Sequence, residues 1–204
     1  MNKEPIISHW GTELKGKLTE NNSQTLCIIL PGIAYLLDRS YLDYSKQLAL
    51  ELGHDVLEVE YGFHVNRSPF NINEEFDILA NETIKVIESS MTKEYKDIVI
   101  IGKSIGTCLQ VLINKHFNGK ISKNIYISPI DKTANIGITE NSLVITGTKD
   151  PLLSADSLSK INNVPGVETI TIADANHALD IVGNVNATIK VLLDTIKKEK
   201  EFLK

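Results

Sequence analysis

The chain has 204 residues, and this length predicts a single domain spanning residues 1–204, because domains average about 150 residues. Hydrophobic residues make up 42% and charged residues 23%, which excludes a fibrous or low-complexity chain. The 21 Lys and Arg residues against 26 Asp and Glu residues leave a net charge of −5, which argues against a nucleic-acid-binding protein.

Short apolar runs alternate with longer amphipathic stretches, a pattern typical of an α/β protein whose mostly parallel central sheet carries helices on both faces. The expected strands are 26–30, 56–61, 98–101, 125–127, 143–146 and 168–172. An N-terminal hairpin of 6–11 and 14–19 is expected at the sheet edge.

Apolar residues recur every three or four positions in the segments between these runs, which predicts helices over 41–52, 74–91, 105–117 and 185–196. We expect Asn73 to cap the second helix, with Glu82 on its solvent-facing side. The lysine-rich residues after 196 are expected to fray.

The segment GKSIG around Ser104 lies between an expected strand and an expected helix, the setting in which G-x-S-x-G forms a nucleophile elbow. Small residues on either side allow a sharp turn that presents the serine hydroxyl. A serine that merely caps the helix is the alternative. A phosphate-binding P-loop is excluded, because Asp97 stands where that motif requires glycine.

A nucleophilic serine needs a histidine base and an acid that orients the histidine. Asp150 follows the expected strand 143–146, and His177 follows the last expected strand. Asp131 is the second choice of acid and Asp174 a further competitor. The other histidines are expected on the surface or packed at the ends of elements: His9, His54, His64 and His116.

An oxyanion needs backbone N–H donors, usually from the residue after the nucleophile and from the loop after an early strand. Ile105 supplies the first candidate. Ile33, which follows the Pro-Gly turn at the end of strand 26–30, supplies the second. An ordinary turn is the alternative interpretation of Pro-Gly.

These motifs together resemble those of small single-domain α/β-hydrolases, including the dienelactone-hydrolase-like group. The matching segments are GKSIG with Ser104, GTKDP with Asp150 and NHALD with His177. The resemblance covers essentially the whole chain. Two features depart from it: LPGI replaces the His-Gly segment of many members, and serine stands where dienelactone hydrolases use cysteine, so that activity is not implied.

The residues between the fourth and fifth expected strands, 129–141, are too few for a cap domain, which predicts an open site. We therefore expect a serine hydrolase that cleaves a small ester, thioester or amide, as a carboxylesterase or thioesterase, through Ser104, His177 and Asp150. No metal or cofactor is expected. Lys103 is expected to be a solvated neighbour of the serine.

Two other functions compete with hydrolysis: a catalytically inactive α/β-hydrolase-fold protein that binds a small ligand or a protein, and a nucleotide-binding protein. Cys27 and Cys108 lie in apolar runs, which predicts buried free thiols, and the N-terminal segment lacks the apolar stretch of a signal peptide. No run approaches the ~18 apolar residues of a membrane span. We expect a cytoplasmic protein with a small-molecule acyl substrate and no nucleic-acid or membrane partner, and a homodimer is left open.

Overall fold

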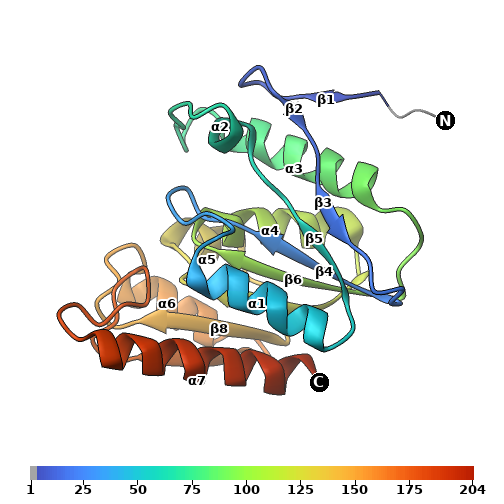
Figure 1. Ribbon diagram of the computed structural model, residues 1–204. Helices are drawn as coiled ribbons and strands as arrows, with labels where there is room; N and C mark the ends of the chain where they lie inside the picture. Colours follow the sequence, from blue (N-terminus) through green and yellow to red (C-terminus); the bar gives the residue numbers. More distant parts are fainter. Residues whose placement is uncertain (1–3) are drawn as a thin grey trace.

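A computed structural model of the protein describes residues 4–204 and shows a seven-stranded sheet with the strand order β3-β5-β4-β6-β7-β8-β9 (Figure 1). Neighbouring strands run parallel except for the edge pair β3 and β5. The mostly parallel sheet expected from the sequence is confirmed. Its strands are β3 (Lys17–Thr19), β4 (Thr25–Leu30), β5 (Asp55–Glu58), β6 (Asp97–Lys103), β7 (Ile121–Ile127), β8 (Ser142–Gly147) and β9 (Glu168–Ile172).

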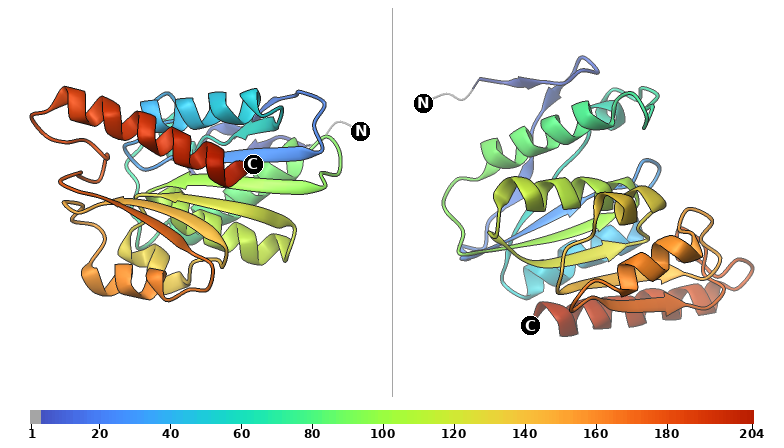
Figure 2. Two further views of the ribbon diagram at one scale, coloured as in Figure 1. Left: turned by 90° about the horizontal axis from the view of Figure 1, so that it is seen from below. Right: turned by 180° about the vertical axis from the view of Figure 1, so that it is seen from behind.

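Helices cover both faces of the sheet (Figure 2). Alternate residues of a strand face opposite sides, so the central strands need apolar residues at every position. In β6, Ile98 and Ile100 enter the core beneath the helices α3 and α4, whereas Val99 and Ile101 enter the core beneath α1 and α7. The helices are α1 (Ser40–Glu51), α2 (Gly62–Val65), α3 (Phe76–Ser90), α4 (Ile105–Phe117), α5 (Asp131–Ile136), α6 (Ala155–Asn162) and α7 (Val185–Leu203).

The N-terminal segment differs from the expected hairpin at the sheet edge. The strands β1 (Ile6–Ile7) and β2 (Glu13–Leu14) pair with each other in a separate two-stranded sheet, and only β3 joins the central sheet. The expected strand 56–61 is also too long, because the chain leaves the sheet after Glu58. Tyr61 then precedes α2, and its hydroxyl donates to the Pro31 carbonyl at 2.9 Å.

Helix α3 begins at Phe76, and Asn73 does not cap it. The expectation that Glu82 faces solvent is wrong. Its side chain is buried and accepts hydrogen bonds from Ser8 Oγ at 2.9 Å and from the His9 backbone N–H at 2.5 Å. The N-terminal segment therefore covers a position that helical periodicity alone assigns to the polar face.

Helix α7 continues to Leu203, seven residues beyond the expected end at 196. The expected fraying is wrong because Glu199 and Leu203 are buried against the rest of the protein. Packing against α1 keeps this lysine-rich end helical, since buried contacts outweigh a weak local preference.

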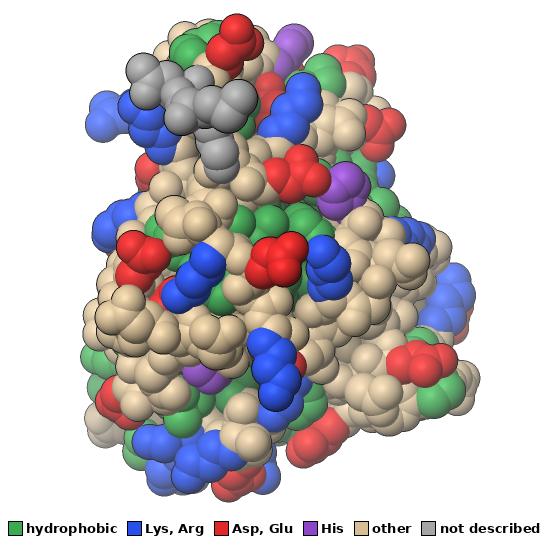
Figure 3. Space-filling view, turned by 90° about the vertical axis from the view of Figure 1, so that its right-hand side faces the viewer, with side chains coloured by type: hydrophobic (Ala, Val, Ile, Leu, Met, Phe, Trp, Pro, Cys, Tyr) green, Lys and Arg blue, Asp and Glu red, His purple; other side chains and the backbone are tan. Residues whose placement is uncertain are grey.

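The region that could hold a cap domain contains only the short helix α5, and residues 128–142 are described throughout. No cap domain is therefore inserted between β7 and β8. Cys27 and Cys108 are buried and free. No helix within residues 4–204 has the length and apolar character to cross a membrane. On the face in Figure 3, at the amino ends of the central strands, acidic and basic side chains are interspersed.

Candidate active site

The strand β6 runs into helix α4 through a single strained residue, Ser104. Its φ of 54° and ψ of −118° lie in a region that side-chain-bearing residues rarely adopt, and its backbone N–H donates to the Ile127 carbonyl at 3.1 Å. Such strain persists only where surrounding contacts impose it and is concentrated at functional sites. The turn places the serine at the carboxyl edge of the sheet.

The two glycines of GKSIG are required by close packing. A Cβ added to Gly106 would lie 2.7 Å from the carbonyl oxygens of Leu30 and Pro31 at the end of β4. A Cβ on Gly102 would lie 2.6 Å from Gln110 Oε1 and 2.9 Å from the Gly106 carbonyl oxygen. The positive φ falls on the serine itself, so the glycines serve to bring α4 close to the sheet.

The structure brings together the three residues that the sequence singles out. His177 Nε2 lies 2.9 Å from Ser104 Oγ, and His177 Nδ1 lies 2.8 Å from Asp150 Oδ2. A carboxylate only accepts hydrogen bonds, so Nδ1 carries the proton and Nε2 is free to accept the serine proton. Asp150 follows β8 and His177 follows β9, which places both at the same sheet edge as Ser104.

Burial fixes the geometry of the acid. The Asp150 side chain is fully buried, and its Oδ1 accepts a hydrogen bond from the Leu152 N–H at 2.9 Å. Both carboxylate oxygens therefore have partners, which a buried charge requires. The His177 side chain remains 25% exposed, open to a substrate from outside.

The competing acids have other partners. Asp131 Oδ1 accepts hydrogen bonds from the N–H and hydroxyl of Ser154 at 2.8 and 2.9 Å, and the backbone hydrogen bond is the main cause that lowers the pKa of this carboxyl. Asp174 is exposed and lies 3.7 Å from Lys149. Asp150 is thus the acid that the structure places beside the histidine.

Two backbone N–H groups beside Ser104 are available to an oxyanion. Neither the N–H of Ile33 nor that of Ile105 has a hydrogen-bond acceptor among residues 4–204. Ile105 is the first residue of α4, where unpaired N–H groups and the helix dipole favour negative charge.

The loop that carries Ile33 is held by a histidine that sequence reasoning assigned to the surface or an element end. His64 Nε2 lies 2.8 Å from the Ile33 carbonyl oxygen, which can only accept, so this nitrogen carries the proton. The ring stacks on Tyr61 at a centroid distance of 5.2 Å, and burial lowers the pKa of His64. Nothing in the sequence indicates this contact between residues 31 positions apart.

A mostly apolar pocket of about 520 Å³ opens over the serine. Its lining combines the loop after β4 with the loops that carry the acid and the histidine: Ile33, Ala34, Tyr35, Ser104, Pro151, Leu152, Asn176, His177 and Ala178. Tyr35 is the aromatic residue in this lining, whereas Tyr41 and Tyr61 are buried in the core.

Lys103 contradicts the expectation of a solvated side chain, because it is completely buried. It is the last residue of β6, and its side chain points to the face of the sheet covered by α1 and α7. Desolvation lowers the pKa of this lysine to about 7, against the opposing influence of Asp150 and Asp180.

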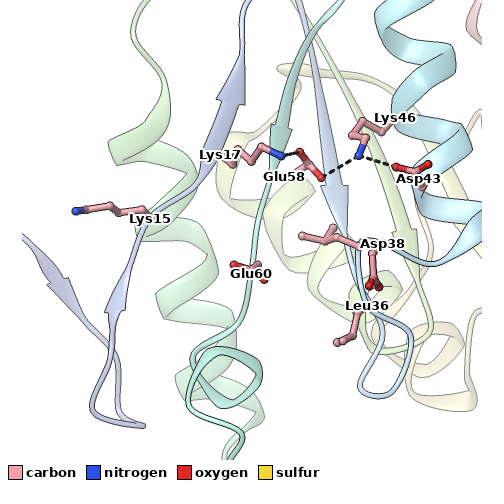
Figure 4. A pocket seen from close by; sticks show the side chains of 9 residues that line it. Lys15, Lys17, Leu36, Asp38, Asp43, Lys46, Glu58 and Glu60 are labelled. Atoms are coloured by element: carbon pink, nitrogen blue, oxygen red, sulfur yellow. Dashed lines mark hydrogen bonds and ion pairs between the residues drawn. The ribbon is translucent and has the colours of Figure 1, made fainter.

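A second pocket, of about 540 Å³, lies beside the loop after β4 and is lined by charged residues (Figure 4). Lys46 Nζ lies 2.7 Å from Asp43 and 3.4 Å from Glu58, and Lys17 lies 3.1 Å from Glu58. The opposite charges within these ion pairs offset one another. The lining contains no serine, cysteine or histidine nucleophile. No cluster of metal-ligating side chains occurs within the described part of the chain.

Comparisons with known proteins add the fold. No protein-family model matches the chain, and no curated protein matches it in sequence. Among solved structures, Est1E from Butyrivibrio proteoclasticus with ferulic acid bound has a TM-score of 0.72 at 17% identity, over 97% of this chain and 96% of that one.

Two further solved structures are similar to the chain over most of its length. The Pyrococcus furiosus esterase Pf2001 has a TM-score of 0.69 at 18% identity, over 98% of this chain and 90% of that one. XC6422 from Xanthomonas campestris, an α/β serine hydrolase without a lid, has a TM-score of 0.70 at 11% identity, over 98% and 92%. The chain therefore has the α/β-hydrolase fold.

Proposed function

We propose that the protein is a serine hydrolase that cleaves a small ester, thioester or amide through an acyl-enzyme intermediate. The observation that carries the proposal is the chain of contacts from Ser104 Oγ through His177 to the buried Asp150, at 2.9 and 2.8 Å. The strained turn at Ser104 and the apolar pocket over it support the proposal. The structural neighbours, which are esterases and a serine hydrolase, support it further.

In the proposed reaction each group has one role. His177 Nε2 takes the proton as Ser104 Oγ attacks the carbonyl carbon, and Asp150 holds the ring and stabilises the imidazolium. The N–H groups of Ile33 and Ile105 receive the negative charge that develops on the carbonyl oxygen. His177 then protonates the leaving group, and water releases the acid from the serine by the same steps in reverse order.

The pocket supports a modest, uncharged acyl group as the part of the substrate that binds. Its lining is mostly apolar, and no domain covers it, so loops set the specificity. Ile33 and Leu152 remain 41% and 48% exposed at this pocket, where an acyl chain would cover them. An open site favours a substrate dissolved in water over one drawn from a lipid interface.

The test is intact mass after treatment with a fluorophosphonate, which labels an activated serine without requiring the natural substrate. We expect one adduct on the wild type and none on Ser104→Ala. Ser8→Ala, which removes another buried serine far along the chain from the site, serves as a control that should keep the adduct.

Absence of an adduct on the folded wild type would contradict the proposal. It would favour the alternative, a catalytically inactive protein of this fold that binds a small ligand or a protein partner. A positive result justifies comparing short acyl esters, thioesters and amides as substrates, with the same Ser104→Ala variant as the blank.

A further inference from the structure

Lys103 places an amino group in the interior immediately behind the catalytic candidates. Its Nζ donates to the carbonyl oxygen of His177 and to the hydroxyl of Ser128, each at 2.9 Å. The same nitrogen lies 4.7 Å from the ring centroid of Tyr35 and 5.9 Å from that of Tyr41, within the range of a cation–π interaction. One buried group thus contacts four segments of the chain.

These contacts join the segments around the pocket. Tyr35 belongs to the loop that carries Ile33, and its hydroxyl accepts from the Tyr41 N–H at 3.1 Å at the start of α1. Tyr41 in turn donates to the Leu179 carbonyl at 3.3 Å, two residues beyond His177. The lysine therefore ties the histidine loop to the loop that carries an oxyanion donor.

A buried ammonium group is costly unless a charge offsets it. No ion pair formed by the described residues includes Lys103, and the nearby carboxylates of Asp150 and Asp180 act on it only at longer range. A methionine would fill the same space without this cost. A buried amino group without an ion pair, beside a candidate site, is typical of a functional role.

Ser128 shows that the surrounding chain is shaped to meet this donor. It is fully buried and adopts a φ of 45°, uncommon for a residue other than glycine, and its N–H donates to the Ile145 carbonyl at 2.7 Å. Its hydroxyl is the second acceptor of the lysine.

We propose that Lys103 is a positioning residue of the hydrolase site: its charged amino group holds the His177 loop, through the His177 carbonyl, in register with Ser104 and with the loop of Tyr35. This inference rests on the proposed serine hydrolase function. Below a pH of about 7, where the amino group is charged, its hydrogen bonds are about twice as strong as those of a neutral donor and hold the His177 loop more firmly.

The direct test is Lys103→Met, which keeps the aliphatic stem and removes both hydrogen bonds. We expect kcat for p-nitrophenyl acetate, and the rate of fluorophosphonate labelling, to fall about 10-fold or more, since small misplacements of catalytic groups have large effects on rate. KM should stay within about two-fold, because the lysine does not line the pocket.

Lys123→Met is the matched control. Lys123 also lies on a strand, donates to a backbone carbonyl, that of Phe202, at 2.8 Å and lies 5.8 Å from an aromatic ring centroid. It belongs to the first half of β7, at the other end of the sheet from Ser104. Its replacement should leave kcat and labelling unchanged. An equal fall in both variants would show that loss of any lysine contact on the sheet is the cause.

The pH profile separates positioning by charge from simple packing. The carboxylates of Asp150 and Asp180 favour the ammonium form of Nζ. His177 and the phenols of Tyr35 and Tyr41 also lie around Nζ, and burial raises the pKa of both phenols. Wild-type kcat should decline above a pH of about 7, as the lysine loses its charge, and this decline should be missing from Lys103→Met. Profiles of identical shape would overturn the proposal.

If Lys103→Met does not fold, as judged by circular dichroism, Ser128→Gly decides. Glycine tolerates the positive φ and removes one of the two acceptors, so kcat should fall about five-fold with KM unchanged. An unchanged kcat would overturn the positioning role. If the wild type and the folded Lys103→Met variant are labelled equally fast, this inference alone is refuted. If the wild type is not labelled, the hydrolase proposal is refuted.

Discussion

Stability should depend on pH through Glu199, a fully buried carboxyl group between α7 and α1. Ser45 Oγ lies 2.7 Å from both the Tyr41 carbonyl oxygen and Glu199 Oε2. The hydroxyl has one proton, and the carbonyl can only accept, so the second contact needs a proton from the carboxyl group. Burial accordingly raises the pKa of Glu199 from 4.5 to about 8.

The sign of the effect follows from the protons bound. Between pH 4.5 and about 8 the folded protein holds a proton on Glu199 that the unfolded chain has released, so rising pH favours unfolding. A full proton of difference between the two states lowers the free energy of unfolding by about 1.4 kcal/mol per pH unit. Because the group is only half-titrated at each end of the interval, the total loss is about 4 kcal/mol. That is a large fraction of the ~5–15 kcal/mol of a typical protein.

Glu199→Gln isolates this contribution, since an amide has the same shape, donates to Ser45 and does not ionise. The free energy of unfolding in urea, followed by circular dichroism at several pH values, should show the variant gaining about 4 kcal/mol on the wild type between pH 4.5 and 8. Glu201→Gln, an exposed change on the same helix, should run parallel to the wild type. Parallel curves for Glu199→Gln as well would refute the reasoning.

The remaining predictions concern the site. Asp150→Asn should lower kcat by about 10²-fold or more, because the amide no longer fixes the Nδ1 tautomer of His177. Asp131→Asn should leave the rate of steady-state ester hydrolysis unchanged. The reverse ranking of the two variants would identify Asp131 as the acid. His64→Phe should lower kcat about 10-fold, because it removes the hydrogen bond to the Ile33 carbonyl. His64→Gln keeps an N–H donor and should recover part of the lost kcat. Equal rates for the two variants would contradict the hydrogen-bond role of His64.

Local patterns are sufficient to locate the central strands of the sheet, because a strand buried on both faces must be apolar throughout. The helix over 105–117 and the strand over 168–172 have the predicted limits. Two of the errors occur where a distant segment overrides a local pattern. Glu82 is buried because the N-terminal segment folds over it, and α7 extends to Leu203 because its end packs on the core.

In the candidate site, too, some residues follow from local patterns and others depend on distant contacts. Motifs and the order along the chain predict Ser104, Asp150 and His177, because parallel strands present their carboxyl ends at one edge of the sheet. Lys103 and His64 are not predicted in this way, because their importance depends on contacts across 74 and 31 positions. A lysine beside a serine gives no sign in the sequence that it faces the interior.

The order of the strands also determines the order in which the residues of the candidate site come together during folding. From β6 onward each new strand adds beside the previous one, in the order β6-β7-β8-β9, so the sheet grows outward in a single direction. During synthesis Ser104 emerges first, and the proposed acid Asp150 and base His177 follow 46 and 73 positions later. A partly folded chain therefore holds an ordinary, unreactive hydroxyl. Reactivity at Ser104 would mark the moment at which the last strand has docked, making the chemistry a reporter of completed assembly.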